Sequence, residues 1–279
     1  SLKELHKISS LTHIPLYELK HVLDPREKPR ASKRDKYSLI IFRDIFPKTK
    51  GKKVTFPIEF IITKNFLLTV TSEKSGAIQK SIKEIDALLW KKIEREGFHV
   101  LVYKILLDLV REYEKHLEWV DGEVDELEEV SILAREKDLT TLLHLKREVI
   151  FILRSLLSNR DVLNDITANK LEFLKPNEYL YELSTEFGQV TNTTEIIKDR
   201  ITNITEIHIS STSNNLNKVM KRFTIIASIL LIPTVISGIY GMNIALPFQE
   251  NPNAFLIVLF IMFISIFLTL YYFNKKDWL

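Results

Sequence analysis

The feature that most constrains this chain is an apolar run near its carboxyl end that continues directly out of a polar sequence. The run from about Phe223 to Tyr240 has no charged residue and is close to the length of about 20 residues that a helix needs to cross a bilayer. Steps of alternately three and four residues, taken back from Gly241, meet one continuous series of positions that are mostly small or oxygen-bearing, which we call the seam. This spacing places the seam on one stripe of a helix that packs nearly parallel to copies of itself. In chain order the seam is Asp199, Asn203, Glu206, Ser210, Ser213, Asn217, Met220, Thr224, Ala227, Leu231, Thr234, Gly238 and Gly241.

Two interpretations of the seam compete. Small residues let membrane helices approach one another closely, and Ser and Thr can cross-link neighbouring helices. Alternatively, oxygen-bearing side chains are costly in a bilayer unless they face water or one another, so a ring of such helices would line a pore with hydroxyls and amides. Met220 and Leu231 would then form apolar collars. The polar positions extend over many turns, which favours the pore.

The sequence that leads into the apolar run predicts one very long helix. From residue 177 to residue 232 only Gly188 interrupts a stretch free of Gly and Pro, and about 56 residues at roughly 1.5 Å each span about 80 Å. Many Thr and Asn residues give this stretch a low intrinsic helix propensity. The stretch is therefore either a polar linker or a helix that neighbouring copies hold in place, and Ile197, Ile201 and Ile204 supply the second, apolar seam that such packing needs. Two spans cannot enclose a conduit, so several copies are required.

A second apolar run, Phe255 to Phe273, predicts a second span. Its polar residues are only Ser265, Thr269 and the terminal Tyr271 and Tyr272, so we expect it to form a lipid-facing ring.

The charges beside the two runs predict the orientation. The loop from Gly241 to Ala254 carries no Lys or Arg, whereas both outer flanks are basic. By the positive-inside rule, both chain termini are cytoplasmic, the loop is external and the protein lies in the cell membrane. The flanking cations are Lys218, Lys221, Arg222, Lys275 and Lys276.

The first part of the chain, Ser1 to about Glu94, reads as an α/β domain. Strand-like runs occur at Tyr37–Phe42, Thr55–Ile62 and Phe66–Thr71, and the basic segment Lys48–Lys53 is expected to be a solvated hairpin loop. His6, His13 and His21 have no partners at metal-ligand spacing, so we expect ordinary surface or turn residues.

Composition excludes several classes of protein. The chain has no Cys and therefore no thiolate metal site or disulfide, and its net charge of +3 is too small to predict nucleic-acid binding. No Walker A, HExxH or nucleophile-elbow motif is present, so no enzyme is predicted.

The middle of the chain, from Gly76 to about Leu174, has helical periodicity. An acidic stretch runs from Glu112 to Glu129, and a second amphipathic run covers Leu139–Asn159. We expect an antiparallel pair of helices. The acids form either a solvated helix face or a negative field that concentrates divalent cations near the pore mouth.

One motif links the chain to a known family. Tyr240-Gly241-Met242-Asn243, placed between two C-terminal spans, resembles the signature of the CorA family of magnesium transport proteins. Weaker matches cover nearly all of the chain. They include Asn217, Met220-Lys221, Thr224–Pro233, Asp24-Pro25, Pro29-Arg30, Thr63-Lys64-Asn65 and the chain end Lys275-Lys276-Asp277-Trp278-Leu279.

The resemblance implies an α+β membrane protein that assembles as a homopentamer in a lipid bilayer. The expected order is an α/β domain (1–94), an acidic antiparallel helical region (95–175), a stalk helix with the first span (176–243), an external loop (244–254), and a second span with a basic end (255–279). The expected partners are identical subunits and divalent cations, with no nucleic acid.

Mg²⁺ chemistry suggests how the motif works. Mg²⁺ is octahedral and loses its water reluctantly, so a ring of Asn243 amides is expected to capture the hydrated ion within a filter of Gly241, Met242 and Asn243. Asn217 and Thr234 would be inner stations, and the absence of carboxylates would let the ion leave. The expected pore lining is Asn217, Met220, Phe223, Thr224, Ala227, Leu231, Thr234 and Gly238.

The resemblance further implies that Mg²⁺ is both transported and regulatory, with no organic cofactor. Glu182 and Glu206 match the family's regulatory metal positions, although the opposing carboxylate has no counterpart in Ser75–Lys83. Transport is expected to be passive and driven by the membrane potential. The alternatives are a transporter for Zn²⁺, Co²⁺ or Ni²⁺, which the intact Met242 disfavours, and a non-conducting membrane scaffold or sensor.

Overall fold

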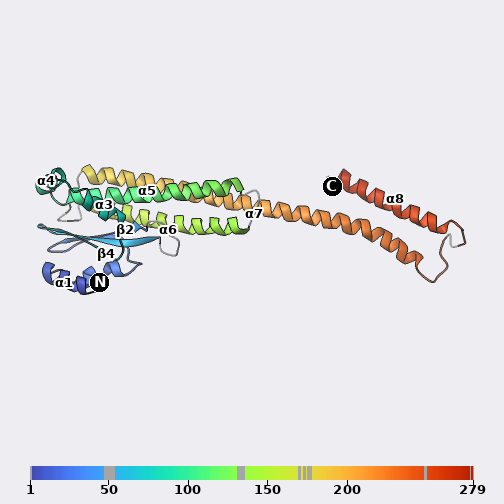
Figure 1. Cartoon of the computed structure of the whole chain (residues 1–279), viewed down its shortest axis with the longest axis horizontal. Helices are drawn as coiled ribbons and strands as arrows, with labels where there is room; N and C mark the ends of the chain where they lie inside the picture. The colour runs from blue at the N-terminus through green and yellow to red at the C-terminus, as the bar shows by residue number, and fades with distance from the viewer. Residues whose placement is uncertain are drawn as a thin grey trace. The chain divides into compact units, whose positions relative to one another are not determined.

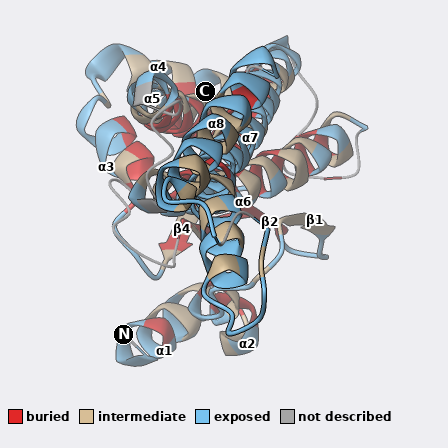
Figure 2. Cartoon of the chain, turned by 90° about the vertical axis from the view of Figure 1, so that its right-hand side faces the viewer, coloured by how far each residue is buried: buried red, intermediate tan, exposed pale blue. Residues whose placement is uncertain are grey.

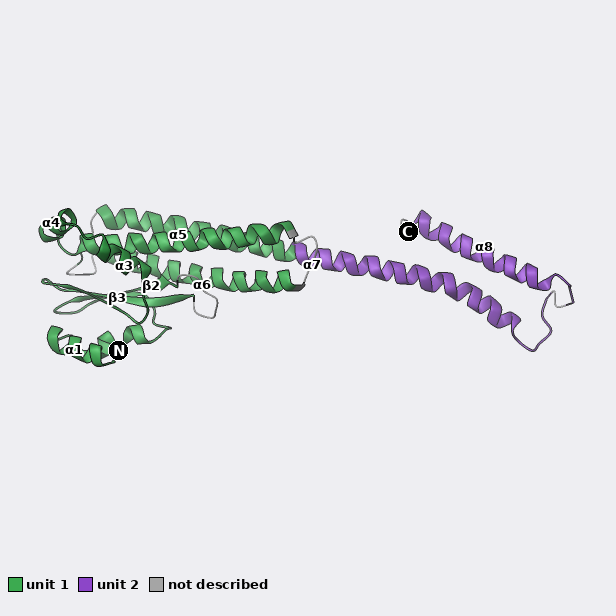
Figure 3. Ribbon diagram, in the orientation of Figure 1, with its two compact units in different colours: residues 1–206 green, residues 207–279 purple. Residues whose placement is uncertain are grey.

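The computed structural model describes residues 2–46, 54–130, 136–168, 171, 174, 178–247, 250–276 and 278 (Figure 1). The chain divides into two compact units, residues 1–206 (unit 1) and 207–279 (unit 2), coloured separately in Figure 3. The predicted loop at Lys48–Lys53 and the residue Asp277 lie outside the described residues.

Unit 1 contains a four-stranded antiparallel sheet in the order β1-β2-β3-β4. The three predicted runs are confirmed as β2 (Ser38–Ile45), β3 (Thr55–Ile62) and β4 (Leu67–Thr71). β1 (Arg30–Lys33) was not predicted because its residues, Arg-Ala-Ser-Lys, show no apolar pattern. It pairs only with β2, at the edge of the sheet.

The sheet separates two apolar clusters because alternate strand residues point to opposite faces. Ile40 and Phe42 face one cluster, which α3 (Gly76–Lys83), α5 (His99–Val130) and α6 (Glu136–Thr167) also build. Leu39 and Ile41 face the other cluster, beneath α1 (Leu2–Thr12), α2 (Leu16–Leu19) and the 3₁₀ helix η1 (His21–Leu23). Figure 1 shows these layers on the two sides of the sheet.

The predicted antiparallel pair is confirmed as α5 and α6, which follow α4 (Ala87–Glu96). His116 Nε2 on α5 lies 2.7 Å from Glu148 Oε1 on α6. α6 is also fixed to the sheet by Asn159, whose amide accepts from Arg43 N at 2.8 Å and donates to Arg43 O at 2.9 Å. Both backbone groups of Arg43 therefore point away from β3. Because Arg43 makes no backbone hydrogen bond to its cross-strand neighbour Pro57, the missing N–H of that proline costs no hydrogen bond at this position.

α7 (Glu178–Tyr240) is one helix of 63 residues with Pro233 inside it, and α8 (Ala254–Lys275) has 22 residues. Both helices are long and apolar enough to cross a membrane, which confirms the two predicted candidate spans. The predicted role of Ile197, Ile201 and Ile204 is wrong. These side chains are buried in the core of their own unit, so the first part of α7 is packed within its own chain and needs no neighbouring copy there.

Candidate ion pathway

Two stripes of α7 differ sharply in exposure. Every seam residue from Asp199 to Gly241 is exposed, and even the apolar Leu231 is 62% exposed. A second series at the same 3-4 spacing is buried in unit 1, and it consists of Phe187, Val190, Thr194, Ile197, Ile201 and Ile204. This buried stripe is offset from the seam by two residues, or about 200° around the helix. The chain therefore covers one side of α7 and leaves the seam side bare.

The same division continues through the apolar part of α7. Ile225 is buried, and Ile229 and Ile236 are partly buried, at positions that extend the covered stripe. α8 shows a matching stripe of reduced exposure that includes Met262 and Ile266. Figure 2 shows both helices mostly in the colours of exposed and intermediate residues. Within unit 2, the seam is again on the uncovered side.

The hydroxyl groups of the seam are oriented by their own helix. Thr224 Oγ1 donates to Met220 O at 2.9 Å, and Thr234 Oγ1 donates to Leu230 O at 2.6 Å. A hydroxyl whose proton is used in this way still has acceptor capacity on its oxygen. Each threonine therefore presents a hydrogen-bond acceptor on the exposed side of the helix. This is the polarity that the donor waters of a hydrated cation require.

The predicted filter forms the turn that ends α7. Gly241 N donates to Ser237 O at 2.9 Å, and Met242 N donates to Ile239 O at 3.2 Å. A Cβ at Gly241 would lie 3.1 Å from Ser237 O, tighter than nine in ten such contacts. The chain therefore reverses most readily with glycine at this point. Met242 and Asn243 follow with exposed side chains.

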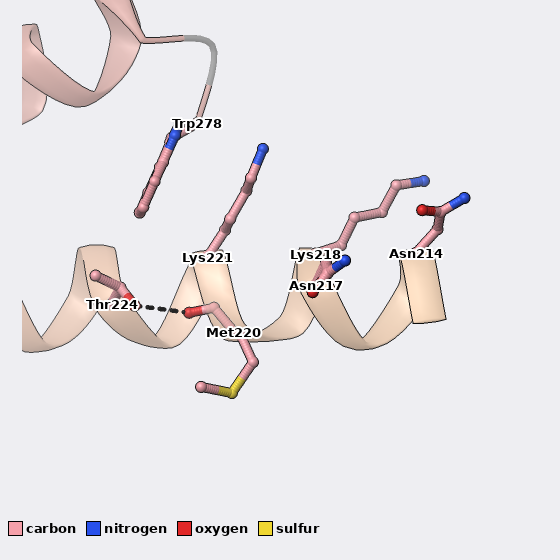
Figure 4. Close-up of a pocket in the computed structure, with 7 residues that line it drawn as sticks. All are labelled: Asn214, Asn217, Lys218, Met220, Lys221, Thr224 and Trp278. Carbon is pink, nitrogen blue, oxygen red and sulfur yellow. Dashed lines mark hydrogen bonds between the residues drawn. The ribbon is translucent and has the colours of Figure 1, made fainter. Parts of the chain in front are cut away.

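The other end of the predicted pore lining borders an open cleft of about 530 Å³ in unit 2. Lys221 Nζ lies 5.6 Å above the ring of Trp278, which stacks on Phe273. In Figure 4, the side chain of Met220 points away from Trp278. The cleft is lined by Asn214, Asn217, Lys218, Met220, Lys221, Thr224 and Trp278. Phe223, beside this cleft, is exposed.

The two predicted regulatory glutamates lie on α7 at positions that the structure does not bring together. Glu182 Oε2 accepts from Tyr103 OH at 3.3 Å, and Glu206 is exposed. Within the described residues, no group of three or more His, Asp or Glu side chains is arranged to hold a metal ion. Glu182 nevertheless falls on the seam when its 3-4 spacing is continued backwards, so both glutamates occupy the bare side of α7.

The acidic stretch of α5 is partly neutralised by a residue that the sequence did not single out. Arg200 on α7 contacts Asp121 at 2.5 Å, Asp125 at 2.6 Å and Glu128 at 2.8 Å. We call this group the Arg200 clasp. Nearby, burial and the carboxylates of Glu186 and Glu118 raise the pKa of Glu114. The stretch is thus an interhelix contact at one end and an acidic surface at the other.

His21 also departs from expectation. It was predicted to be an ordinary surface or turn residue, but its Nδ1 is buried and lies 3.8 Å from Glu18 Oε2 and 3.9 Å from Glu59 Oε2. The three residues come from η1, α2 and β3, and sequence spacing gives no sign that Glu59 is near the other two.

These features define a class of protein: an α/β unit joined by a very long helix to a pair of candidate membrane spans, with a polar stripe left bare along the first span. The profile of the CorA-like Mg²⁺ transporter protein family matches residues 1–276, and the chain therefore belongs to that family. Its members are transport proteins rather than enzymes.

Individual relatives agree in sequence and in structure. The chain is 28% identical over 281 residues to the cobalt/magnesium transport protein CorA of Methanocaldococcus jannaschii, covering 99% of this chain and 88% of the relative. It is 28% identical over 270 residues to the protein of the same name from Thermotoga maritima, covering 94% of this chain and 76% of that relative. The complete structure of the M. jannaschii transporter superposes with a TM-score of 0.85 at 27% identity, over 100% of this chain and 89% of that one.

Proposed function

We propose that this protein is a passive Mg²⁺ channel of the cell membrane, a homopentamer whose pore is lined by the seam of α7. The observation that carries the proposal is the bare seam, whose residues from Asp199 to Gly241 are all exposed. A stripe of small and oxygen-bearing residues in a membrane helix needs either water or other polar groups beside it. Five copies around an axis would give each seam a water-filled pore to face.

Hydrated Mg²⁺ would be captured at a ring of five Asn243 side chains at the outer mouth. Amide oxygens can accept hydrogen bonds from the ion's coordinated waters without displacing them, which suits an ion that dehydrates reluctantly. Thr234 and Asn217 would be the next stations inward, and the outward acceptor of Thr234 supports this role. Met220 and Leu231, both exposed on the seam, would form the apolar constrictions.

The membrane potential would drive uptake, with both chain termini cytoplasmic. Each elementary charge gains roughly 2.3 kcal/mol per 100 mV, and Mg²⁺ carries two charges. Cytoplasmic Mg²⁺ bound between subunits near Glu182 and Glu206 would close the pore. The placement of both glutamates on the bare side of α7 supports an intersubunit site. The five segments with boundaries at 94, 175, 243 and 254 remain our proposed functional division.

Flux measurements on the purified full chain in liposomes test the proposal. With an inside-negative potential and a fluorescent Mg²⁺ indicator inside, we expect wild-type uptake that stops when the potential is removed. Asn243→Ala should abolish the uptake. Asn253→Ala is the matched control because this nearby loop amide makes no side-chain cap bond to α8, and it should conduct normally.

Competing divalent cations separate the alternatives. Uptake of Mg²⁺ that exceeds uptake of Zn²⁺, Co²⁺ and Ni²⁺ at equal concentration supports a magnesium channel. Normal Mg²⁺ uptake by Asn243→Ala would overturn the filter, and no uptake by wild type would favour a scaffold. Native mass spectrometry of the same preparation reads the number of subunits directly.

A further inference from the structure

Glu59 is a carboxyl group in an apolar layer. It lies in the middle of β3, opposite Ile41 of β2 and Val70 of β4. Those two neighbours belong to the apolar cluster beneath α1, α2 and η1. Glu59 is fully buried, and neither of its oxygens has a hydrogen-bond partner. A buried carboxylate without partners is costly, so this group strongly favours its neutral form.

A second buried carboxyl group and an imidazole lie beside it. Glu18 is fully buried, and its Oε1 accepts from Arg34 Nε at 2.8 Å and from Tyr37 OH at 3.4 Å. Its Oε2 is buried without a partner. His21 Nδ1 lies 3.8 Å from that oxygen and 3.9 Å from Glu59 Oε2, so it stands between the two carboxyl groups.

The surrounding charges leave one negative charge uncompensated if both glutamates ionise. Arg34 pairs with Glu18, and Arg30 pairs with Glu27 at the rim. Burial and the Glu18 charge raise the pKa of Glu59 to about 8, whereas burial and Arg30 lower the pKa of His21. The titratable and charged groups that face the cluster are Tyr17 and Glu18 from α2, Glu27 and Arg30 from β1 and the turn before it, and Arg34 and Tyr37 from the turn between β1 and β2.

We propose that Glu18, His21 and Glu59 form a buried proton-binding site that couples the docking of α1, α2 and η1 on the sheet to pH. With the proton bound, the layer covers a neutral Glu59 carboxyl. When the layer opens, Glu59 meets water and releases the proton to solvent. Opening therefore becomes more frequent as the proton concentration falls.

The sign and the pH window follow from linkage. Glu59 has a folded-state pKa above its unfolded value, so its contribution to stability is complete below about 4.5 and is lost as pH rises through about 8. His21 has a lowered folded-state pKa, so its contribution is lost as pH falls below 6.5 and opposes that of Glu59 there. Between about 6.5 and 8, Glu59 titrates differently in the two states, whereas the opposing contribution of His21 falls below this window. Opening should rise in that window by about tenfold per pH unit.

Hydrogen exchange of the full chain in detergent, read by mass spectrometry from pH 5.5 to 9, tests the proposal. After correction for intrinsic exchange, protection in peptides covering residues 2–24 should fall about tenfold per unit between pH 6.5 and 8 and level off above 8. Glu59→Gln, which stays neutral, should keep its protection throughout this window. Glu73→Gln, a matched change at an exposed glutamate before α3, should behave as wild type.

Three outcomes would overturn the proposal: pH-independent protection in wild type, an unchanged pH slope in Glu59→Gln, or Co²⁺ or Zn²⁺ restoring protection at pH 8.5, which would identify a metal site instead. Infrared spectroscopy of wild type provides a test that does not depend on folding of the variant. The carbonyl band of a protonated buried carboxyl should be present at pH 7, where the pKa of about 6 leaves the buried Asp44 mostly ionised, and it should disappear above pH 8. Its absence at pH 7 would also refute the proton site.

Discussion

The attachment of α6 to the sheet gives a quantitative prediction about the stability of unit 1. In Asn159→Ala, Arg43 N loses the 2.8 Å bond to the amide oxygen, whereas Arg43 O keeps its 3.0 Å bond from Tyr113 OH. Asn159 is fully buried, so water does not readily replace the missing acceptor. An orphaned buried donor costs about 1–3 kcal/mol, and the bond lost at the carbonyl adds about 1 kcal/mol. The expected loss is about 2–4 kcal/mol.

Circular dichroism during heating of the full chain in detergent measures this loss. For a unit of this size, each kcal/mol lowers the midpoint by about 2–4 °C, so Asn159→Ala should unfold about 5–15 °C below wild type. Asn164→Ala, at an exposed position on the same helix, should unfold within about 1 °C of wild type, as surface changes usually do. If the two variants unfolded at the same temperature, the pair of hydrogen bonds between Asn159 and Arg43 would not hold α6 to β2.

Three further predictions concern α7. Arg200→Gln should destabilise unit 1 by only about 1–2 kcal/mol, because every partner in the clasp is partly exposed. Thermal unfolding should show a smaller loss of stability in high salt, and a loss that does not depend on salt would contradict an ionic clasp. Thr234→Val should lower Mg²⁺ flux about fivefold, the factor that corresponds to about 1 kcal/mol of lost hydrogen bonding, whereas Thr234→Ser should conduct as wild type. Equal flux in both variants would show that Thr234 does not line the pore. Glu182→Ala should raise the cytoplasmic Mg²⁺ concentration needed to halve flux, and an unchanged dose response would remove Glu182 from the regulatory site.

Local sequence patterns were sufficient for the elements whose burial they encode. β2, β3 and the two candidate spans are rich in apolar residues, and the two strands and α8 were predicted close to their observed bounds. β1 was missed because an edge strand with Arg, Ser and Lys has no such pattern. The 3-4 spacing of Ile197, Ile201 and Ile204 correctly indicated a packed face, but spacing cannot tell whether the partner is the same chain or another copy.

The parts of the candidate site that lie on one element were predictable from the sequence, and the parts that join separate elements were not. The seam and the motif at its end can be read from α7 alone, since all their residues lie on one helix and the turn after it. The Arg200 clasp and the Glu18–His21–Glu59 cluster join residues from separate elements. Only the folded chain shows that Glu59, in a strand of apolar residues, lies under His21.

The period of the seam adds a constraint on how the copies of α7 must be arranged. A strict 3-4 alternation repeats every 3.5 residues, whereas a straight helix has 3.6 residues per turn and drifts about 20° per heptad. From Asp199 to Gly241 the seam covers six heptads, 42 residues, so in straight parallel helices it would turn by about 120° and leave the axis before reaching the filter. Left-handed wrapping of the copies around one another cancels this drift. In the homopentamer that we propose, a single axial pathway that includes both Glu206 and Asn243 therefore requires the five copies of α7 to supercoil.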